Sequence, residues 1–305
     1  EKAGVLFIED FLRNCKEKIN LIITREDFDE RLLKRYQDKI AHVIQKDFRF
    51  AGAVITDSKF MTFDFLVENA RRLNCVFNNL SDDWSRETLV AFINQKLSMN
   101  TEYLRSVKSN SPQYFERNLL NVSDHEVFVD CGAYVGDSAI SFIEFLKSQG
   151  IRHYNKIISF EPNRMSYQRL IAKNLPNHLC INAGVYDRSG TAHFKNSVFK
   201  SMTRIDETGE QTIQLDTIDN VLAGDRATII KMDIEGAELP ALRGAKETIK
   251  KHQPSLVISI YHKRADLWEI PDYIAELGLD YEFYIRAYAD TANELIFYAI
   301  PSRSE

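Results

Sequence analysis

The 305-residue sequence lacks several features that mark particular classes of protein. Its four cysteines, Cys15, Cys75, Cys131 and Cys180, are far apart and form no C-x-x-C pair, so the spacing indicates no zinc site. No apolar run approaches the ~20 residues that span a bilayer. The N-terminus also shows no secretory signal pattern. We therefore expect reduced thiols in a cytoplasmic protein that has no membrane span.

An excess of basic charge is also missing. The chain has 39 Lys and Arg against 44 Asp and Glu, which gives a formal net charge of -5. Proteins that bind nucleic acid usually present a basic face, so DNA and structured RNA are unfavoured partners. There are no repeats or low-complexity tracts. The 44% hydrophobic content is ordinary for a globular protein, and the length suits one large domain or two modest ones.

What the sequence does contain is an apolar run that ends in an acidic, glycine-punctuated turn, at residues 127–138. Gly132 and Gly136 can adopt positive φ or let a ligand approach the main chain closely. The spacing is D-x-G-x-x-x-G instead of the G-x-G-x-x-G of dinucleotide-binding folds, and Tyr134 stands where the middle glycine would be. The turn predicts a nucleotide-sized pocket for a ligand without a pyrophosphate.

Strand-like and helix-like segments alternate after residue 119. Expected strands are 127–130, 156–160, 179–185, 228–233 and 255–261; expected helices are 138–149, 163–174, 237–251 and 265–277. This order predicts a doubly wound parallel sheet. Short insertion strands are expected at 191–194, 201–205 and 212–215, and the runs 281–288 and 294–300 have the spacing of a hairpin.

Residues 1–119 are expected to be mainly helical. Amphipathic stretches occupy 4–23, 28–45, 58–73 and 85–97, with a β-like piece at 50–56. Ser81 and Ser85 are candidate N-caps for the last of these helices. We predict that residues 1–119 form a cap or a homodimer surface and that residues 120–305 form the catalytic domain.

Several segments together resemble the FkbM-type family of class I S-adenosylmethionine-dependent methyltransferases, over about residues 127–301. They are the glycine turn, Phe160–Asn163, Leu215–Asp216, Ile230–Glu238 and Ile258–His262. The resemblance implies a Rossmann-like α/β fold with a mostly parallel seven-stranded sheet and an antiparallel C-terminal hairpin. It also implies S-adenosylmethionine as the cofactor.

Ligands of open α/β sheets collect at the carboxyl ends of the strands, and the predicted cofactor-binding residues lie there. Glu161 can accept both ribose hydroxyls, although an acid is also favoured at a helix N-terminus for electrostatic reasons alone. Asn182 and Ala183 resemble the segment that flanks adenine, with a simple turn as the alternative. The full predicted set is Asp130, Gly132, Ala133, Tyr134, Gly136, Asp137, Ser138, Glu161, Asn163, Asn182, Ala183 and Asp233.

The predicted catalytic residues are Lys231, Asp233, Glu235 and His262. Lys231 and Asp233 point to the same face of a strand, which suggests a charge pair. His262, with an unperturbed pKa of ~6.5, is the candidate base, oriented by Asp233 or Glu235. Glu235 and Glu238 also fit as helix-start acids. Oxygen and imidazole ligands suit Mg²⁺ or Mn²⁺, but D-x-E-x-x-E is no recognised ligand signature, so a divalent metal is not favoured.

The resemblance implies O-methylation of a small-molecule hydroxyl, and for this chain we favour a saccharide or its nucleotide-activated precursor as the acceptor. Aromatic side chains such as Tyr134 and Trp268 are candidates to stack on a sugar, and Arg286 is a candidate to meet an anionic substrate. One alternative is N-methylation of a small amine. Another is a non-catalytic module that holds the cofactor or a partner, and a dinucleotide-dependent oxidoreductase comes third.

Overall fold

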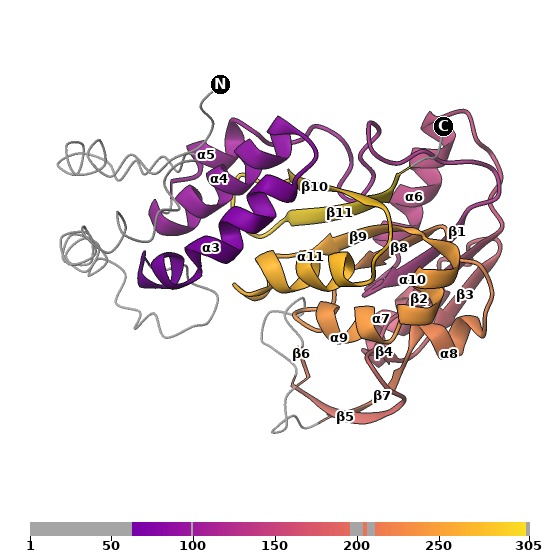
Figure 1. The fold of residues 1–305 in the computed structure, drawn as a ribbon. Helices are drawn as coiled ribbons and strands as arrows, with labels where there is room; N and C mark the ends of the chain where they lie inside the picture. The colour runs from indigo at the N-terminus through magenta and orange to yellow at the C-terminus, as the bar shows by residue number, and fades with distance from the viewer. Residues whose placement is uncertain (1–62, 99, 196–203, 206–210, 303–305) are drawn as a thin grey trace. The chain divides into compact units, whose positions relative to one another are not determined.

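A computed structural model describes residues 63–98, 100–195, 204–205 and 211–302 (Figure 1). The chain divides into two compact units. The first contains the chain up to Asn110 with 260–272 and 283–296, and the second contains 111–259, 273–282 and 297–305. The helices expected at 4–23 and 28–45 and the β-like piece at 50–56 lie outside the described residues.

The described helices and strands follow the expected alternation. The helices are α3 (Phe63–Asn79), α4 (Asp83–Ser98), α5 (Glu102–Arg105), α6 (Asp137–Ser148), α7 (Arg164–Ile171), α8 (Ile218–Leu222), α9 (Glu238–Arg243), α10 (Lys246–His252) and α11 (Asp266–Glu276). The strands are β1 (Val127–Cys131), β2 (Lys156–Phe160), β3 (His178–Ile181), β4 (Gly184–Val185), β5 (Gly190–Lys195), β6 (Arg204–Ile205), β7 (Gln211–Asp216), β8 (Ile229–Met232), β9 (Ser255–Ser259), β10 (Tyr281–Ala287) and β11 (Leu295–Pro301).

The predicted fold class is confirmed. A seven-stranded sheet has the order β10-β11-β9-β8-β1-β2-β3. Strands β9, β8, β1, β2 and β3 pair in parallel. The last two strands form the expected hairpin, in which the Tyr288 amide donates to the Glu294 carbonyl over 3.0 Å. Every residue of β1 is buried, as in a parallel sheet covered on both faces.

Aromatic side chains fill the core of the second unit beside β1. Phe115 is fully buried and its ring lies 5.8 Å from Phe128, 5.8 Å from Phe142 and 5.6 Å from Phe145, between ring centroids. Aromatic pairs at such separations stabilise the fold by more than the burial of their surface area alone. The cluster therefore anchors both helix α6 and the segment that precedes β1.

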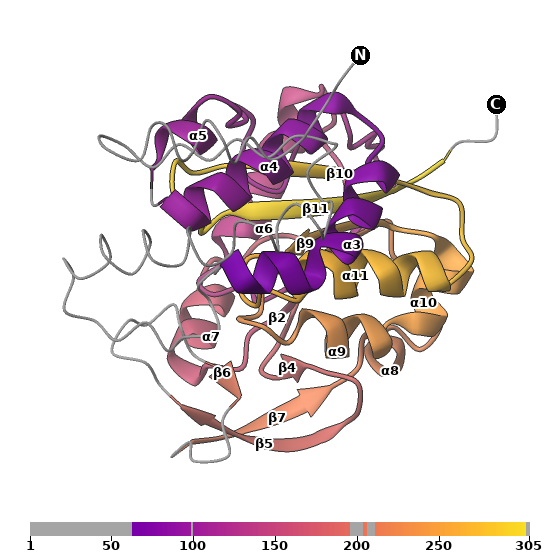
Figure 2. The same ribbon diagram turned by 60° about the vertical axis from the view of Figure 1, so that its left-hand side comes forward.

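The strand expected at 179–185 is two strands in different sheets. The chain leaves the parallel sheet after β3, and β4 pairs instead with β7 in a four-stranded sheet of order β4-β7-β5-β6. In Figures 1 and 2, β5 and β7 project away from helices α8 and α9. Asn182 marks the exit, since its amide donates to the carbonyls of Glu161 and Pro162. Hydrophobic periodicity cannot predict a hydrogen bond of this kind between a side chain and a distant main-chain carbonyl.

The helix expected at 237–251 is also interrupted, at Gly244 and Ala245 between α9 and α10. A Cβ on Gly244 would lie 2.0 Å from the carbonyl oxygen of Tyr186. The main-chain carbonyl of Gly244 accepts the amide of Asp219. Close contact with two remote segments therefore ends α9 where the local sequence reads as continuous helix.

In the first unit, the expected helix at 85–97 is present as α4, but its N-cap is neither Ser81 nor Ser85. The Asp82 carboxylate caps the helix by accepting the amide of Ser85 over 2.7 Å. Burial opposes ionisation of Asp82, yet hydrogen bonds from Arg286 and Ser85 lower its pKa.

Arg286 and Trp268 do not have the substrate-facing positions suggested for them. Arg286 is 2% exposed and donates to Asp82 over 2.6 Å, with its guanidinium 4.1 Å from the ring of Trp84. Trp268 is 3% exposed and packs against Phe65. Both side chains belong to the interior of the first unit, so neither is available to a sugar or an anion.

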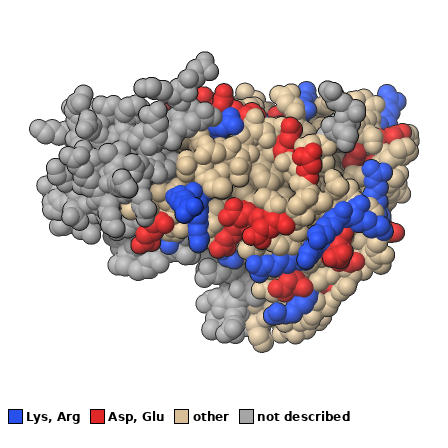
Figure 3. All heavy atoms as spheres, in the orientation of Figure 1, with Lys and Arg blue, Asp and Glu red and all other residues tan. Residues whose placement is uncertain are grey.

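The three described cysteines, at positions 75, 131 and 180, are free thiols. Burial raises the pKa of Cys131, which agrees with a packing role in the glycine turn. Among the described residues, no helix is long and apolar enough to cross a membrane. On the face drawn in Figure 3, acidic and basic side chains lie next to one another, in keeping with the near balance of the two charges in the sequence.

Candidate functional site

The glycine turn follows β1 and is held to the end of β2. The amides of Gly132 and Ala133 donate to the Phe160 carbonyl over 3.1 and 3.0 Å. Gly132 has a φ of +82°, and a Cβ there would lie 2.0 Å from the carbonyl oxygen of Asp233. Glycine at this position therefore lets the ends of β1 and β8 approach each other.

The second half of the turn leads into α6. Gly136 is the N-cap of the helix, with a φ of +91°, and a Cβ there would lie 2.9 Å from Leu170. Tyr134 also has a positive φ, +48°, and its side chain is 38% exposed. Asp137 begins the helix and is exposed, where the helix dipole favours an acid.

Glu161 joins the glycine turn to the end of β2. One carboxylate oxygen accepts the amide of Tyr134 and the other accepts the amide of Asn163, each over 2.8 Å. The residue is 7% exposed. Burial raises the pKa of Glu161 to about 7, although the two amide hydrogen bonds oppose that shift. An acid with this pKa gains or loses its charge near neutral pH.

The two predicted asparagines make local hydrogen bonds to the main chain. The Asn163 side chain caps α7 by accepting the amides of Met165 and Ser166. Asn182 donates to carbonyls at the end of β2, and Ala183 beside it is buried. Both residues therefore shape the rim of the strand ends around Glu161, and their contact with a cofactor stays a prediction.

Asp130 and Lys231 form a buried ion pair across β1 and β8. The two residues are register partners, and the Lys231 ammonium lies 3.1 Å from Asp130 Oδ1. Ser138 donates to the other oxygen of Asp130. The 3.1 Å ion pair of Lys231 is with Asp130, and the Asp233 carboxylate expected from the sequence also interacts electrostatically with Lys231.

Lys231 also fixes the glycine turn. Its ammonium donates to the Gly132 carbonyl over 2.9 Å and approaches that of Cys131 at 3.3 Å. Burial opposes its charge, yet the carboxylates of Asp130 and Asp233 raise the pKa of Lys231. With a side chain that is 3% exposed, Lys231 holds the ends of β1 and β8 together.

The acidic segment after β8 starts with Asp233, whose Oδ2 accepts the phenol of Tyr114 over 2.5 Å. Glu235 and Gly236 follow in left-handed conformations, with φ of +56° and +97°. Glu238 is fully buried at the start of α9 and accepts the amide of Ile234. Glu238 therefore has the helix-start role that the sequence allowed for it.

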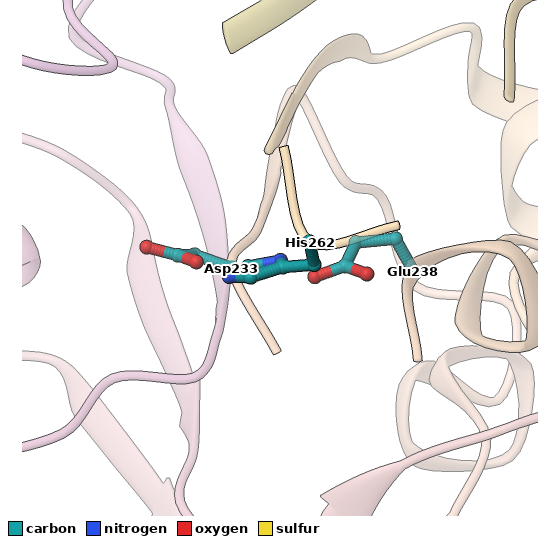
Figure 4. A group of neighbouring side chains, drawn as sticks. All are labelled: Asp233, Glu238 and His262. Carbon is teal, nitrogen blue, oxygen red and sulfur yellow. The ribbon is translucent and has the colours of Figure 1, made fainter. Parts of the chain in front are cut away.

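Figure 4 shows Asp233, Glu238 and His262 as neighbouring side chains, with one candidate ligand atom of each within 4.8 Å of the others. His262 follows β9 and is 4% exposed. Carboxylate and imidazole are groups that bind divalent cations, but acidic groups often gather without one.

Tyr114 is the residue that sequence reasoning missed. It lies in the region assigned to the N-terminal part of the chain, 119 positions before its partner Asp233. A single tyrosine in a polar segment has no distinctive spacing, so the sequence holds no signal that would have identified it.

Comparisons with known proteins agree with the predicted fold and family. A family model, the methyltransferase FkbM domain, matches residues 130–283. A methyltransferase FkbM from Methylobacillus flagellatus KT, known from its crystal structure, is 30% identical with a TM-score of 0.66, over 77% of this chain and 59% of that chain. This chain thus spans less than two thirds of the length of that protein.

Other solved structures are more distant. An rRNA methylase from Streptococcus thermophilus is 12% identical with a TM-score of 0.36, over 59% of this chain and 90% of that one. SMU.1697c from Streptococcus mutans, known from a crystal structure in complex with SAH, is 11% identical with a TM-score of 0.36, over 60% of this chain and 92% of that one. No curated protein matches the chain.

Proposed function

The chain belongs to the family of methyltransferase FkbM domains, and on this premise we propose that it uses S-adenosylmethionine to methylate a hydroxyl of a small molecule. The observation that carries the proposal is the joint between Glu161 and the glycine turn. One buried acid at the end of β2 accepts amides from both the turn and the start of α7. This arrangement fixes a carboxylate beside the glycine turn at a strand end, where ligands of α/β sheets bind.

The residues at these strand ends fit a nucleoside. Each oxygen of an ionised carboxylate has more than one acceptor site, so Glu161 can accept ribose hydroxyls while it keeps its two amide partners. The turn at Gly132–Gly136 would hold the rest of the cofactor against the main chain, and Asn182 and Ala183 would border the base. The exposed ring of Tyr134 stands at the same turn.

When bound, S-adenosylmethionine supplies a methyl carbon on a sulfonium, which is the electrophile for an acceptor oxygen. The protein contributes chiefly by positioning, which can account for much of the acceleration in such a transfer. In the proposal, an imidazole nitrogen of His262 accepts the hydroxyl proton of the acceptor. Asp233 or Glu235 orients that imidazole, while Lys231 holds the ends of β1 and β8 together.

A saccharide, or its nucleotide-activated precursor, is the proposed acceptor. The family resemblance suggests small-molecule hydroxyls, and Tyr134 offers a partly exposed ring on which a sugar face can pack. Methyl transfer needs no metal in this scheme. His262 accepts the proton, Asp233 can orient the imidazole, and Glu238 has a structural role at the start of α9.

Calorimetric titration with S-adenosylmethionine and, separately, with NAD tests the cofactor. We expect binding of the first ligand only. Preference for NAD, or no binding of S-adenosylmethionine, would contradict the proposal.

The acceptor is tested by measuring S-adenosylhomocysteine release with matched alcohol and amine acceptors. We expect turnover with an alcohol and at least a hundredfold loss in the His262→Ala variant, as general bases contribute about 10²–10⁴-fold. The exposed Glu144→Gln serves as the control variant. Turnover of an amine alone, insensitive to His262, would instead identify an N-methyltransferase.

A further inference from the structure

The segment that precedes β1 is fixed by the core of the second unit. Between residues 111 and 120, the Phe115 amide donates to Pro112 and the Leu120 amide to Glu116, each over 3.0 Å. Phe115 is fully buried among the aromatic rings beside β1. The main chain at Tyr114, one residue away, is therefore anchored although it lies outside the matched residues 130–283.

Tyr114 reaches the end of β8 from this anchor. Its phenol donates to Asp233 Oδ2 over 2.5 Å, and the Lys231 ammonium lies 5.0 Å from the centroid of its ring. Its φ of +71° is a left-handed conformation that residues with a Cβ seldom adopt. Such a conformation at a residue that contacts charged groups is typical of a functional site.

The hydrogen bond limits the positions of the Asp233 carboxylate. An aspartate has two rotatable side-chain bonds, and a donor on one oxygen selects an orientation of the other. Hydrogen bonds to an ionised acceptor are stronger than those between neutral groups. Tyr114 meets Asp233 at the strand end where Lys231 already holds the glycine turn, so the carboxylate is fixed relative to that turn.

We propose that Tyr114 is a positioning residue, which holds the Asp233 carboxylate in the orientation that receives the positively charged chain of S-adenosylmethionine. This inference rests on the proposed function, since it takes that molecule as the cofactor. A carboxylate attracts a cationic ligand most effectively when its orientation is set before the ligand arrives. The segment before β1 is thereby part of the cofactor site.

The Tyr114→Phe variant removes only the hydroxyl. The ring that remains keeps its place below Lys231 and its edge contact with Phe115, at 6.4 Å between centroids. Tyr154→Phe is a matched control, because the Tyr154 phenol donates to the Pro176 carbonyl over 2.6 Å and not to a carboxylate. By calorimetry, we expect Tyr114→Phe to bind S-adenosylmethionine about tenfold more weakly, as for one hydrogen bond to a charged group, and Tyr154→Phe to bind as the wild type does.

A double-mutant cycle separates positioning from general damage. If Tyr114 acts through Asp233, the Tyr114→Phe change has little further effect on affinity in an Asp233→Ala background. The same tenfold loss in both backgrounds, or no loss in the single variant, would overturn the inference. A wild-type protein that binds no S-adenosylmethionine would instead contradict the proposed function, and the inference with it.

Discussion

Two buried carboxylates stand at the ends of neighbouring strands and have different partners. Asp130, in β1, is fully buried and paired with the Lys231 ammonium and the Ser138 hydroxyl. Glu161, just after β2, is almost as buried, but the two hydrogen bonds that its carboxylate accepts come from main-chain amides. Burial raises the pKa of Glu161 to about 7.

The difference indicates how the two charges are used. The charge of Asp130 is compensated inside the protein, and the pair joins β1 to β8. The hydrogen-bond partners of Glu161 are neutral amides. Hydroxyl groups of a ligand can therefore stabilise its ionised carboxylate by donating further hydrogen bonds. We therefore expect substitution of Asp130 to act mainly on folding and substitution of Glu161 to act mainly on binding.

The largest expected effect is on stability, from Asp130→Ala. The substitution leaves the Lys231 ammonium buried without its ion-pair partner, and breaking a buried pair in this way costs about 3–5 kcal/mol. Urea unfolding measures the change in the free energy of unfolding. Asp137→Ala, at an exposed acid in the same segment, should cost less than about 1 kcal/mol. Similar losses in both variants would show that the pair contributes little.

Glu161→Gln should produce the opposite pattern. We expect affinity for S-adenosylmethionine to fall about a hundredfold, or ~2.7 kcal/mol, because hydrogen bonds to a charged group are lost. The free energy of unfolding at pH 8 should change little, since relief from burying a charge offsets the one main-chain amide that the Gln NH2 group cannot accept. Calorimetry and urea unfolding on the same preparations test both statements. Loss of stability without loss of affinity would reverse the comparison between the two acids.

The pH dependence of binding follows from the raised pKa of Glu161. With a pKa of about 7, the residue is mostly ionised at pH 8 and mostly protonated at pH 6. Affinity for S-adenosylmethionine should therefore fall about tenfold from pH 8 to pH 6, with proton release on binding near pH 7. Titration in buffers of different ionisation enthalpy measures that release. Glu161→Gln should lack this part of the dependence, and an equal slope in the variant would assign it to another group.

The same shift has a defined sign for stability. Glu161 holds its proton more tightly when folded, with a pKa of about 7 against the 4.5 of an unperturbed glutamate. Its contribution is therefore fully present below pH 4.5 and is lost as the pH rises through 7.

The smallest expected effect is that of Asn163→Ala. Asn163 caps α7 through its side chain, while its main-chain amide binds Glu161. Loss of the cap should cost about 1 kcal/mol of stability, and the amide that supports Glu161 remains. If capping is the only role of the side chain, affinity for S-adenosylmethionine changes less than threefold. A larger loss of affinity would indicate that the asparagine side chain itself contacts the cofactor.

The regular elements around the site could be predicted from sequence. The strand at 156–160 was expected with the bounds that the structure has, and the helix after the glycine turn differs by one residue at each end. Such elements depend on apolar periodicity and turn residues within a few positions. The prediction was wrong where a distant group intervened. The Tyr186 carbonyl against Gly244 separates α9 from α10, and the Asn182 amide accompanies the exit from the parallel sheet.

The candidate site was predicted as a set of residues more than as a set of contacts. Glu161 and the glycine turn were expected at one sheet edge, and the structure joins them through the Tyr134 amide. Lys231 was expected to interact with Asp233, and the Asp233 carboxylate does raise its pKa. The register of β1 against β8 adds the ion pair with Asp130, which the sequence did not indicate. Strand register depends on the whole sheet, so alternation along one strand gives the face of a side chain and not its partner.

The sequence by itself determined the alternation of strands and helices, the acidic glycine turn and the acids that follow two strands, because short-range propensity and periodicity encode these features. Only the tertiary structure decided which charge meets which. The Asp130–Lys231 pair and the Tyr114–Asp233 hydrogen bond join positions 101 and 119 residues apart. Partners so distant are selected by the burial and packing of the complete fold, and no local pattern records them.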